Sequence, residues 1–157
     1  WINNAPSILS HSIFLDPMPL KRFLMLLSNL DFILDPLYFG SGTVFMHSMA
    51  VGTPIVSMPV VQMRSRITLG GYRMMKLENP PVVECINDYI QLCYELSISA
   101  SARKKIREQI NSTKHQLFDN TEVLYQWRQF IVDAVKCSER SEKLPLNWNP
   151  NSNISVK

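Results

Sequence analysis

The chain has 157 residues, of which 46% are hydrophobic and 18% are charged, and its 16 Lys and Arg residues exceed its 13 Asp and Glu residues by three. This composition excludes a disordered chain, and the sequence holds no run of about 18 apolar residues that would span a bilayer. The length is typical of a single globular domain with its own core.

The basic residues are spread along the chain. Their densest cluster, Arg103 to Lys105 with Arg107, is followed at once by Glu108. This pattern favours a solvated helix face over a nucleic-acid-binding surface. We therefore expect neither a nucleic acid nor a membrane as a partner.

Three cysteines, Cys85, Cys93 and Cys137, stand outside any spacing typical of metal sites. Neither a disulfide framework nor a zinc site is indicated, so a reducing, cytoplasmic setting is expected. The first residues carry no initiator Met and no basic or apolar leader pattern, which is typical of a piece of a longer chain.

Short β-branched or aromatic runs alternate with longer helical patterns, as in a parallel sheet covered by helices. In chain order, the predicted elements are a strand at 13–15, a helix at 20–29, a strand at 32–34, a helix at 43–51, a strand at 54–58, a helix at 66–77 and a strand at 82–83. Gly52 is placed to end the helix at 43–51 in the left-handed conformation. The pair Gly70-Gly71 either loosens its helix or lets it pack closely on the sheet.

The remaining part of the chain is predicted to be helical, over 87–98, 101–113 and 122–136. Residues 138–157 differ in composition, with four Asn, two Pro and few core-forming residues. We divide the chain accordingly into a domain at 1–137 and a polar tail at 138–157, which is expected to be poorly ordered or bound to the surface.

The most informative stretch is 32–59, because a strand, a small-residue loop, a helix and a second strand follow one another there as one βαβ unit. The loop Gly40-Ser41-Gly42-Thr43 leaves backbone N–H groups uncrowded at the start of a helix, where a partial positive charge resides. Such a loop suits a phosphate or pyrophosphate. It is neither a GxGxxG motif nor a P-loop, so a tight turn without a ligand is the alternative.

The stretch from Leu34-Asp35 to Met58-Pro59, together with Ser65-Arg66-Ile67, resembles the C-terminal nucleotide-sugar-binding domain of the O-linked N-acetylglucosaminyltransferase and SPINDLY family. The family shows a Leu-Asp strand end, a small-residue loop, a helix, a Gly-Thr-Pro strand start and a later Ser-Arg-Val. The resemblance continues at Leu117-Phe118-Asp119 and covers roughly 13–135. It implies an α/β fold, in which a Rossmann-like parallel sheet with flanking helices forms the C-terminal half of a two-domain B-type glycosyltransferase with a helical C-terminal end.

The resemblance implies that Gly42, Thr43 and Val44 hold the diphosphate of a uridine diphosphate (UDP) sugar, with Gly40 and Ser41 completing the loop. Thr43 keeps the hydroxyl of the family pattern. Gly42 and Val44 stand where the family has side-chain donors, so only their main-chain amides can take that role.

A sixth diphosphate ligand, Arg66, corresponds to the arginine of the family's Ser-Arg pair. It can reach the phosphates or brace the loop at Gly40. A structural salt bridge is the alternative for this side chain.

The ribose and the base are implied to contact Met18, Lys21, Phe23 and His47. His47 stands where the family has an acidic residue that binds the ribose hydroxyls, and a partly buried helix residue is its alternative. The backbone of Met18 corresponds to the position that recognises the base edge. Phe23 offers a ring to the base, although it also fits the core side of its helix. Leu20 replaces a family lysine, with Lys21 beside it.

The implied function is donor binding in a glycosyltransferase that transfers a sugar from a UDP-sugar to a protein acceptor. The acceptor-side domain, which helical repeats can accompany, would precede this chain, so no catalytic residue is expected here and the fragment alone should be inactive. No Asp-x-Asp motif occurs, since apolar residues separate Asp31 from Asp35; a metal-independent reaction without a cofactor is expected, with the UDP-sugar as substrate.

Two other functions stay open. A sugar-nucleotide epimerase uses the same fold and a similar phosphate loop. A non-catalytic nucleotide-binding or interaction module is suggested by the residues found at Gly42, Val44 and His47, which depart from the family pattern.

Overall fold

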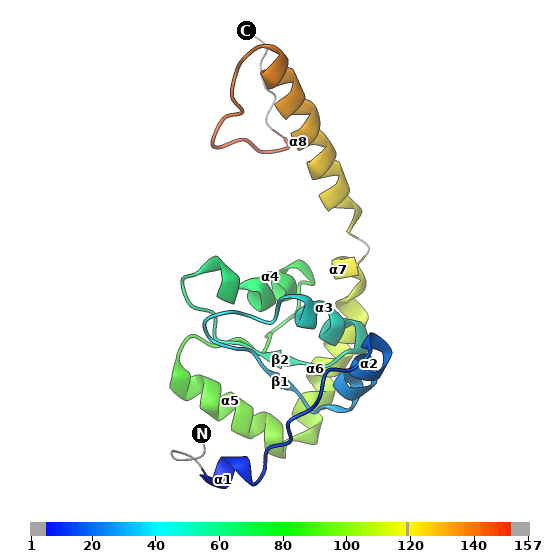
Figure 1. The fold of residues 1–157 in the computed structure, drawn as a ribbon, viewed down its shortest axis with the longest axis vertical. Helices are drawn as coiled ribbons and strands as arrows, with labels where there is room; N and C mark the ends of the chain where they lie inside the picture. Colours follow the sequence, from blue (N-terminus) through cyan, green and yellow to red (C-terminus); the bar gives the residue numbers. More distant parts are fainter. Residues whose placement is uncertain (1–5, 119, 152–157) are drawn as a thin grey trace.

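The computed structural model describes residues 6–118 and 120–151. A small parallel sheet lies in the body of the molecule, with helices around it (Figure 1). Strand β1 (Ile33–Leu34) pairs in parallel with β2 (Ile55–Val56), and Ile33 is the partner of Ile55. A single parallel bridge from Ser57 to Val82 adds a third segment beside β2.

The sheet is smaller than the sequence predicts. The segment at 13–15 forms no strand: Ile13 is 86% exposed and Phe14 80% exposed, and no backbone hydrogen bond joins this segment to another part of the described chain. An extended segment becomes a strand only when a neighbouring strand pairs with it. The fold is thus mixed, mostly helical with a small parallel sheet, and a full Rossmann-like sheet stays a prediction.

The N-terminal half of the chain holds three longer helices, and the sequence predicts all of them. They are α2 (Leu20–Asn29), α3 (Gly42–Val51) and α4 (Ile67–Met74). Gly52 ends α3 with a φ of 82°, as expected. The helix predicted to reach residue 77 stops at Met74, and Lys76, with a φ of 54°, takes a left-handed conformation that an α-helix cannot continue through.

The C-terminal half contains α5 (Ile86–Ile98), α6 (Ala100–Thr113) and α8 (Thr121–Glu139), close to the predicted ranges. The side chains of Ser99 and Asn120 cap α6 and α8, as their residue types favour. The short elements α1 (Pro6–Leu9), η1 (Met63–Ser65) and α7 (His115–Phe118) were not predicted.

Helix α6 ties the body together through its basic residues. The guanidinium of Arg103 lies 3.0 Å from a carboxylate oxygen of Asp31, and Arg107 donates to the carbonyl of Leu30 at 2.9 Å. Only Lys104 and Lys105 of the basic cluster are exposed. The prediction of a wholly solvated face is therefore wrong for the two arginines, because their side chains reach back to the loop between α2 and β1.

The core gathers between α3, α4, β2 and α6. Its buried residues are Phe45, Met49, Ile55, Tyr72, Met75, Leu77 and Ile110. The rings of Phe45 and Tyr72 meet edge to face with centroids 5.5 Å apart. Gly71 leaves the space that Phe45 fills, so this glycine lets α4 approach α3, and the expectation that it packs on the sheet is corrected.

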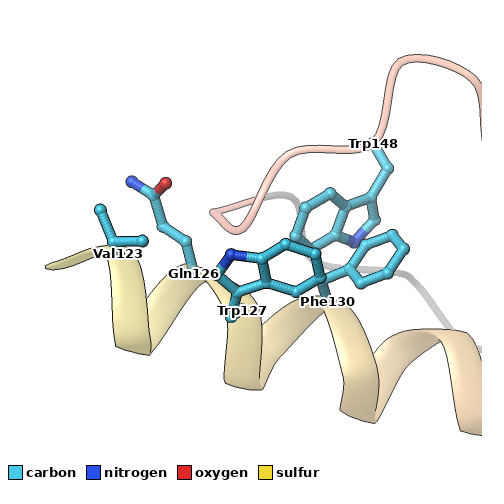
Figure 2. Close-up of a pocket in the computed structure, with 5 residues that line it drawn as sticks. All are labelled: Val123, Gln126, Trp127, Phe130 and Trp148. Atoms are coloured by element: carbon cyan, nitrogen blue, oxygen red, sulfur yellow. The ribbon is translucent and has the colours of Figure 1, made fainter. Parts of the chain in front are cut away.

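Helix α8 projects from the body, and the chain after it turns back along the helix (Figure 1). Trp148 packs on Phe130, with ring centroids 5.4 Å apart, and its indole N–H donates to the buried carboxylate of Asp133 at 3.1 Å. Figure 2 shows the small aromatic pocket that Trp148 and Phe130 form with Trp127. Trp148 thus holds the tail against α8, whereas 152–157 lie outside the described residues.

Candidate functional site

The site begins at the carboxyl end of β1, where the chain enters the loop that precedes α3. Asp35 is 3% exposed, and one of its carboxylate oxygens accepts hydrogen bonds from the amide of Ser41 at 2.8 Å and from its hydroxyl at 2.6 Å. The other oxygen accepts from the hydroxyl of Ser57 at 2.7 Å. Asp35 therefore fixes the loop to the end of the second strand.

A second brace holds the middle of the loop. The guanidinium Nε of Arg64 donates to the carbonyl of Tyr38 at 3.0 Å, and the amide of Gly40 donates to the carbonyl of Arg64 at 2.9 Å. Gly40 is buried, and a Cβ atom there would lie 3.2 Å from that carbonyl oxygen. The loop is therefore braced by Arg64 and not by Arg66, for which the sequence leaves bracing open beside phosphate contact.

The first turn of α3 keeps free donors. The amides of Val44 and Phe45 both point to the carbonyl of Ser41, at 2.8 and 3.3 Å. Within the described ranges, the amides of Gly42 and Thr43 have no backbone partner, and the Thr43 hydroxyl has none either. Gly42 has a φ of 45° and open space where a side chain would stand. This arrangement offers two amides and one hydroxyl to an anion at the positive end of a helix dipole.

Ser41 contributes differently from its neighbours. Its amide and hydroxyl protons are both donated to Asp35, so they are not free for a phosphate. A direct phosphate bond from Ser41 stays a prediction, and it would require the hydroxyl to exchange its partner.

Two of the four residues predicted for the nucleoside lie together. The ring of Phe23 on α2 meets that of His47 on α3 edge to face, with centroids 6.0 Å apart, and both are half-buried. His47 stands one turn along α3 from Thr43, on the same side of the helix. The structure thus places a polar and an apolar ring one turn from the free donors.

Met18 and Lys21, the other two residues predicted for the nucleoside, have no ring contact or hydrogen bond with this pair in the described part of the chain. Met18 is half-buried in the chain that enters α2. Lys21 is exposed and lines a surface hollow that Val51, the last residue of α3, also lines. No residue of the loop at 40–44 lines this hollow.

Arg66 is also separate from the loop donors. Its side chain lines another pocket together with Arg73 of α4. The Arg66 side chain makes no hydrogen bond or ion pair within the part of the chain that the structure describes, so the suggested salt bridge is not seen there. Its role as a phosphate ligand stays a prediction.

Tyr89 of α5 contacts the start of the loop. Its hydroxyl donates to the main-chain carbonyl of Asp35 at 3.3 Å. Burial, with smaller contributions from Cys93 and Asp35, raises the pKa of Tyr89 to about 12. The phenol is therefore protonated, and able to donate, at neutral pH.

The described ranges hold no group of three or more His, Cys, Asp or Glu side chains arranged for a metal ion. In the same ranges, no helix has the length and apolar character needed to cross a lipid bilayer.

Sequence comparison identifies no relative, since no family model matches the chain and no curated protein is similar enough. Among solved structures, a mutant of the O-GlcNAc transferase of Thermobaculum terrenum matches with a TM-score of 0.57 and 23% sequence identity. The match covers 68% of this chain and 22% of that chain, so the protein spans about a fifth of the transferase. At this identity the likeness shows the fold: over two thirds of its length, the chain is folded like part of an O-GlcNAc transferase.

Proposed function

We propose that this chain forms the donor-binding part of a glycosyltransferase and holds the diphosphate of a UDP-sugar at the N-terminus of α3. One observation carries the proposal. The amides of Gly42 and Thr43 and the hydroxyl of Thr43 have no protein partner in the described chain, at an open helix end, on a fold like that of part of an O-GlcNAc transferase.

In this arrangement the loop from Gly40 to Val44 receives the diphosphate. The pair of Phe23 and His47 lies one helix turn away, where the imidazole can bond a ribose hydroxyl and the phenyl ring can contact the base. Met18 and Lys21 keep their predicted contacts as part of the proposal, whereas Arg66, which lines a separate pocket, is left out of this site. A protein acceptor would bind on chain outside these 157 residues, in an upstream domain.

The chemistry of this half-site is electrostatic. As the bond between sugar and diphosphate breaks, negative charge grows on the leaving phosphate oxygens. Preorganised amides and the Thr43 hydroxyl stabilise that charge more than they stabilise the bound substrate. The loop needs no rearrangement for this, because Asp35 and Arg64 already hold it.

Calorimetric titration with UDP tests the proposal. Thr43→Ala removes one hydrogen bond to a charged oxygen and should weaken binding by roughly 1.5 to 3 kcal/mol. Thr121→Ala is the matched control, because Thr121 occupies the first turn of α8 and belongs to no proposed site. Equal UDP affinity of the two variants would contradict a diphosphate at α3.

A second candidate, a nucleotide-binding module without transferase activity, is favoured by one observation. Ser41 donates both its amide proton and its hydroxyl proton to Asp35, and neither Gly42 nor Val44 carries a side-chain donor. UDP binding without glycosyl transfer by the longest expressed form of the protein would select this candidate.

A further inference from the structure

A second pocket lies beside α4, the next long helix after α3 in the chain. It has a volume of about 620 Å³ and lies between α4 and the segment at 80–84, which bridges to the end of β2. Pro59, just beyond β2, also lines it. The pocket thus lies where parallel strands end, the edge at which α/β folds bind ligands. No residue of the loop at 40–44 lines it, so it is separate from the diphosphate site.

Two arginines face this pocket from one helix. Arg66, at the N-cap of α4, and Arg73, in its last turn, are seven residues apart and therefore lie on the same side of the helix. Within the described ranges, neither guanidinium is within 4.0 Å of a carboxylate, and neither makes a hydrogen bond. Arg103, in contrast, pairs with Asp31 at 3.0 Å.

The remaining lining is mostly apolar. Leu69, Leu77 and Val82 supply its walls, and Glu84 is its one carboxylate, which leaves an excess of one positive charge. The volume falls within the range of pockets that hold small organic ligands, roughly 300 to 1,000 Å³. Guanidinium groups are planar donors that suit phosphate oxygens, and they stay charged at any physiological pH.

From these features we propose that the pocket between α4 and residues 80–84 binds a small phosphate monoester with an apolar body, with Arg66 and Arg73 on the phosphate. The two guanidinium groups match the two charges of a monoester near neutral pH. The apolar walls take the body of the molecule. Arg66 belongs to this site and not to the UDP site, so the two sites share no residue.

Titration of the protein with phenyl phosphate tests the site, with inorganic phosphate and benzyl alcohol as probes that each lack one part of the ligand. Phenyl phosphate should bind more tightly than either. Arg66→Gln and Arg73→Gln should each weaken its binding about tenfold or more, as expected for the loss of a charged hydrogen bond. Glu84→Gln should strengthen binding by removing a repulsive charge. Arg128→Gln, an exposed arginine on α8, is the matched control and should change nothing.

The melting temperature of each variant shows that it folds. Unchanged phenyl phosphate binding in both folded pocket variants would overturn the proposal, and so would binding no tighter than that of inorganic phosphate. Thr43→Ala and saturating UDP should leave phenyl phosphate binding intact. Competition by UDP would overturn the separate site, whereas loss of UDP binding alone would count only against the function proposed for α3.

Discussion

At the scale of single residues, a buried carboxylate organises the candidate site. Asp35 accepts three hydrogen bonds, two from Ser41 and one from Ser57, and so joins the loop before α3 to the end of β2. An acceptor with three donors in a buried place is hard to replace, because each donor left without a partner retains its desolvation cost.

Asp35→Asn tests this organising role. The amide group that replaces one carboxylate oxygen would face a hydroxyl or amide donor, so at least one hydrogen bond should be lost. We expect the free energy of unfolding in urea to fall by about 1 to 3 kcal/mol. Asp16→Asn, at an exposed position before α2, is the control and should unfold as the native protein does. An Asp35→Asn variant as stable as this control would show that the carboxylate does not hold the loop.

Tyr89 makes stability depend on alkaline pH. Its pKa is about 12 in the folded protein, against 10.0 for a free tyrosine, so between these values the folded state keeps a proton that the unfolded state has lost. Stability should therefore be fully present below pH 10 and should fall as pH rises towards 12. Between pH 9 and 11, the free energy of unfolding in urea should fall less steeply with pH for Tyr89→Phe than for the native protein. An identical slope in the two proteins would exclude this contribution.

At the scale of elements, the position of α3 decides where the site's donors lie. Helix α4 packs on it through Phe45 and Gly71, and α6 holds its far end, where Lys114 donates to the carbonyl of Ala50 at 2.9 Å. Position 52 there must also be a glycine, because a Cβ atom on Gly52 would lie 2.8 Å from the side chain of Asn111. The N-terminus of α3 is thus fixed by packing as well as by its loop.

The adjacent glycines of α4 provide a matched pair of variants. Gly71→Ala places a methyl group against the ring of Phe45 and should destabilise the protein by about 1 to 3 kcal/mol. Gly70→Ala meets no atom within 4 Å and should stabilise the helix by roughly 0.5 to 1 kcal/mol. Urea unfolding of both variants measures the difference. Equal changes would contradict the close approach of α3 and α4.

The sequence predicts the helices well because their signals are local. Apolar periodicity places α2 and α6, and the residue types at Ser99, Asn120 and Gly52 mark helix ends. The strand predicted at 13–15 carries the same kind of local signal, but a strand also needs a partner, which no local pattern reports.

The site is predictable only in part, for the same reason. The small residues at 40–43 indicate free amides, and these are found at Gly42 and Thr43. The choice between Arg64 and Arg66 as the brace depends on the turn of η1, and the role of Asp35 depends on Ser57, 22 residues away. Neither of these contacts between distant segments can be predicted from the order of residues.

At the scale of the whole molecule, the chain corresponds in fold to 22% of a transferase. Sugar transfer requires donor and acceptor to be held within reacting distance, and the residues assigned here all concern the donor. If the chain binds the donor as we propose, it should bind the nucleotide without transferring sugar on its own.

Amide chemical shifts measured by nuclear magnetic resonance during a UDP titration test whether the diphosphate of UDP lies against the first turn of α3, as we propose. The amide signals of Gly42 and Thr43 should then shift in a saturable way with UDP. Uridine, which lacks the diphosphate, should leave them nearly in place, and the signals of Thr121 and Glu122 at the start of α8 should not move with either ligand. Saturable UDP binding that leaves Gly42 and Thr43 unshifted would contradict the account.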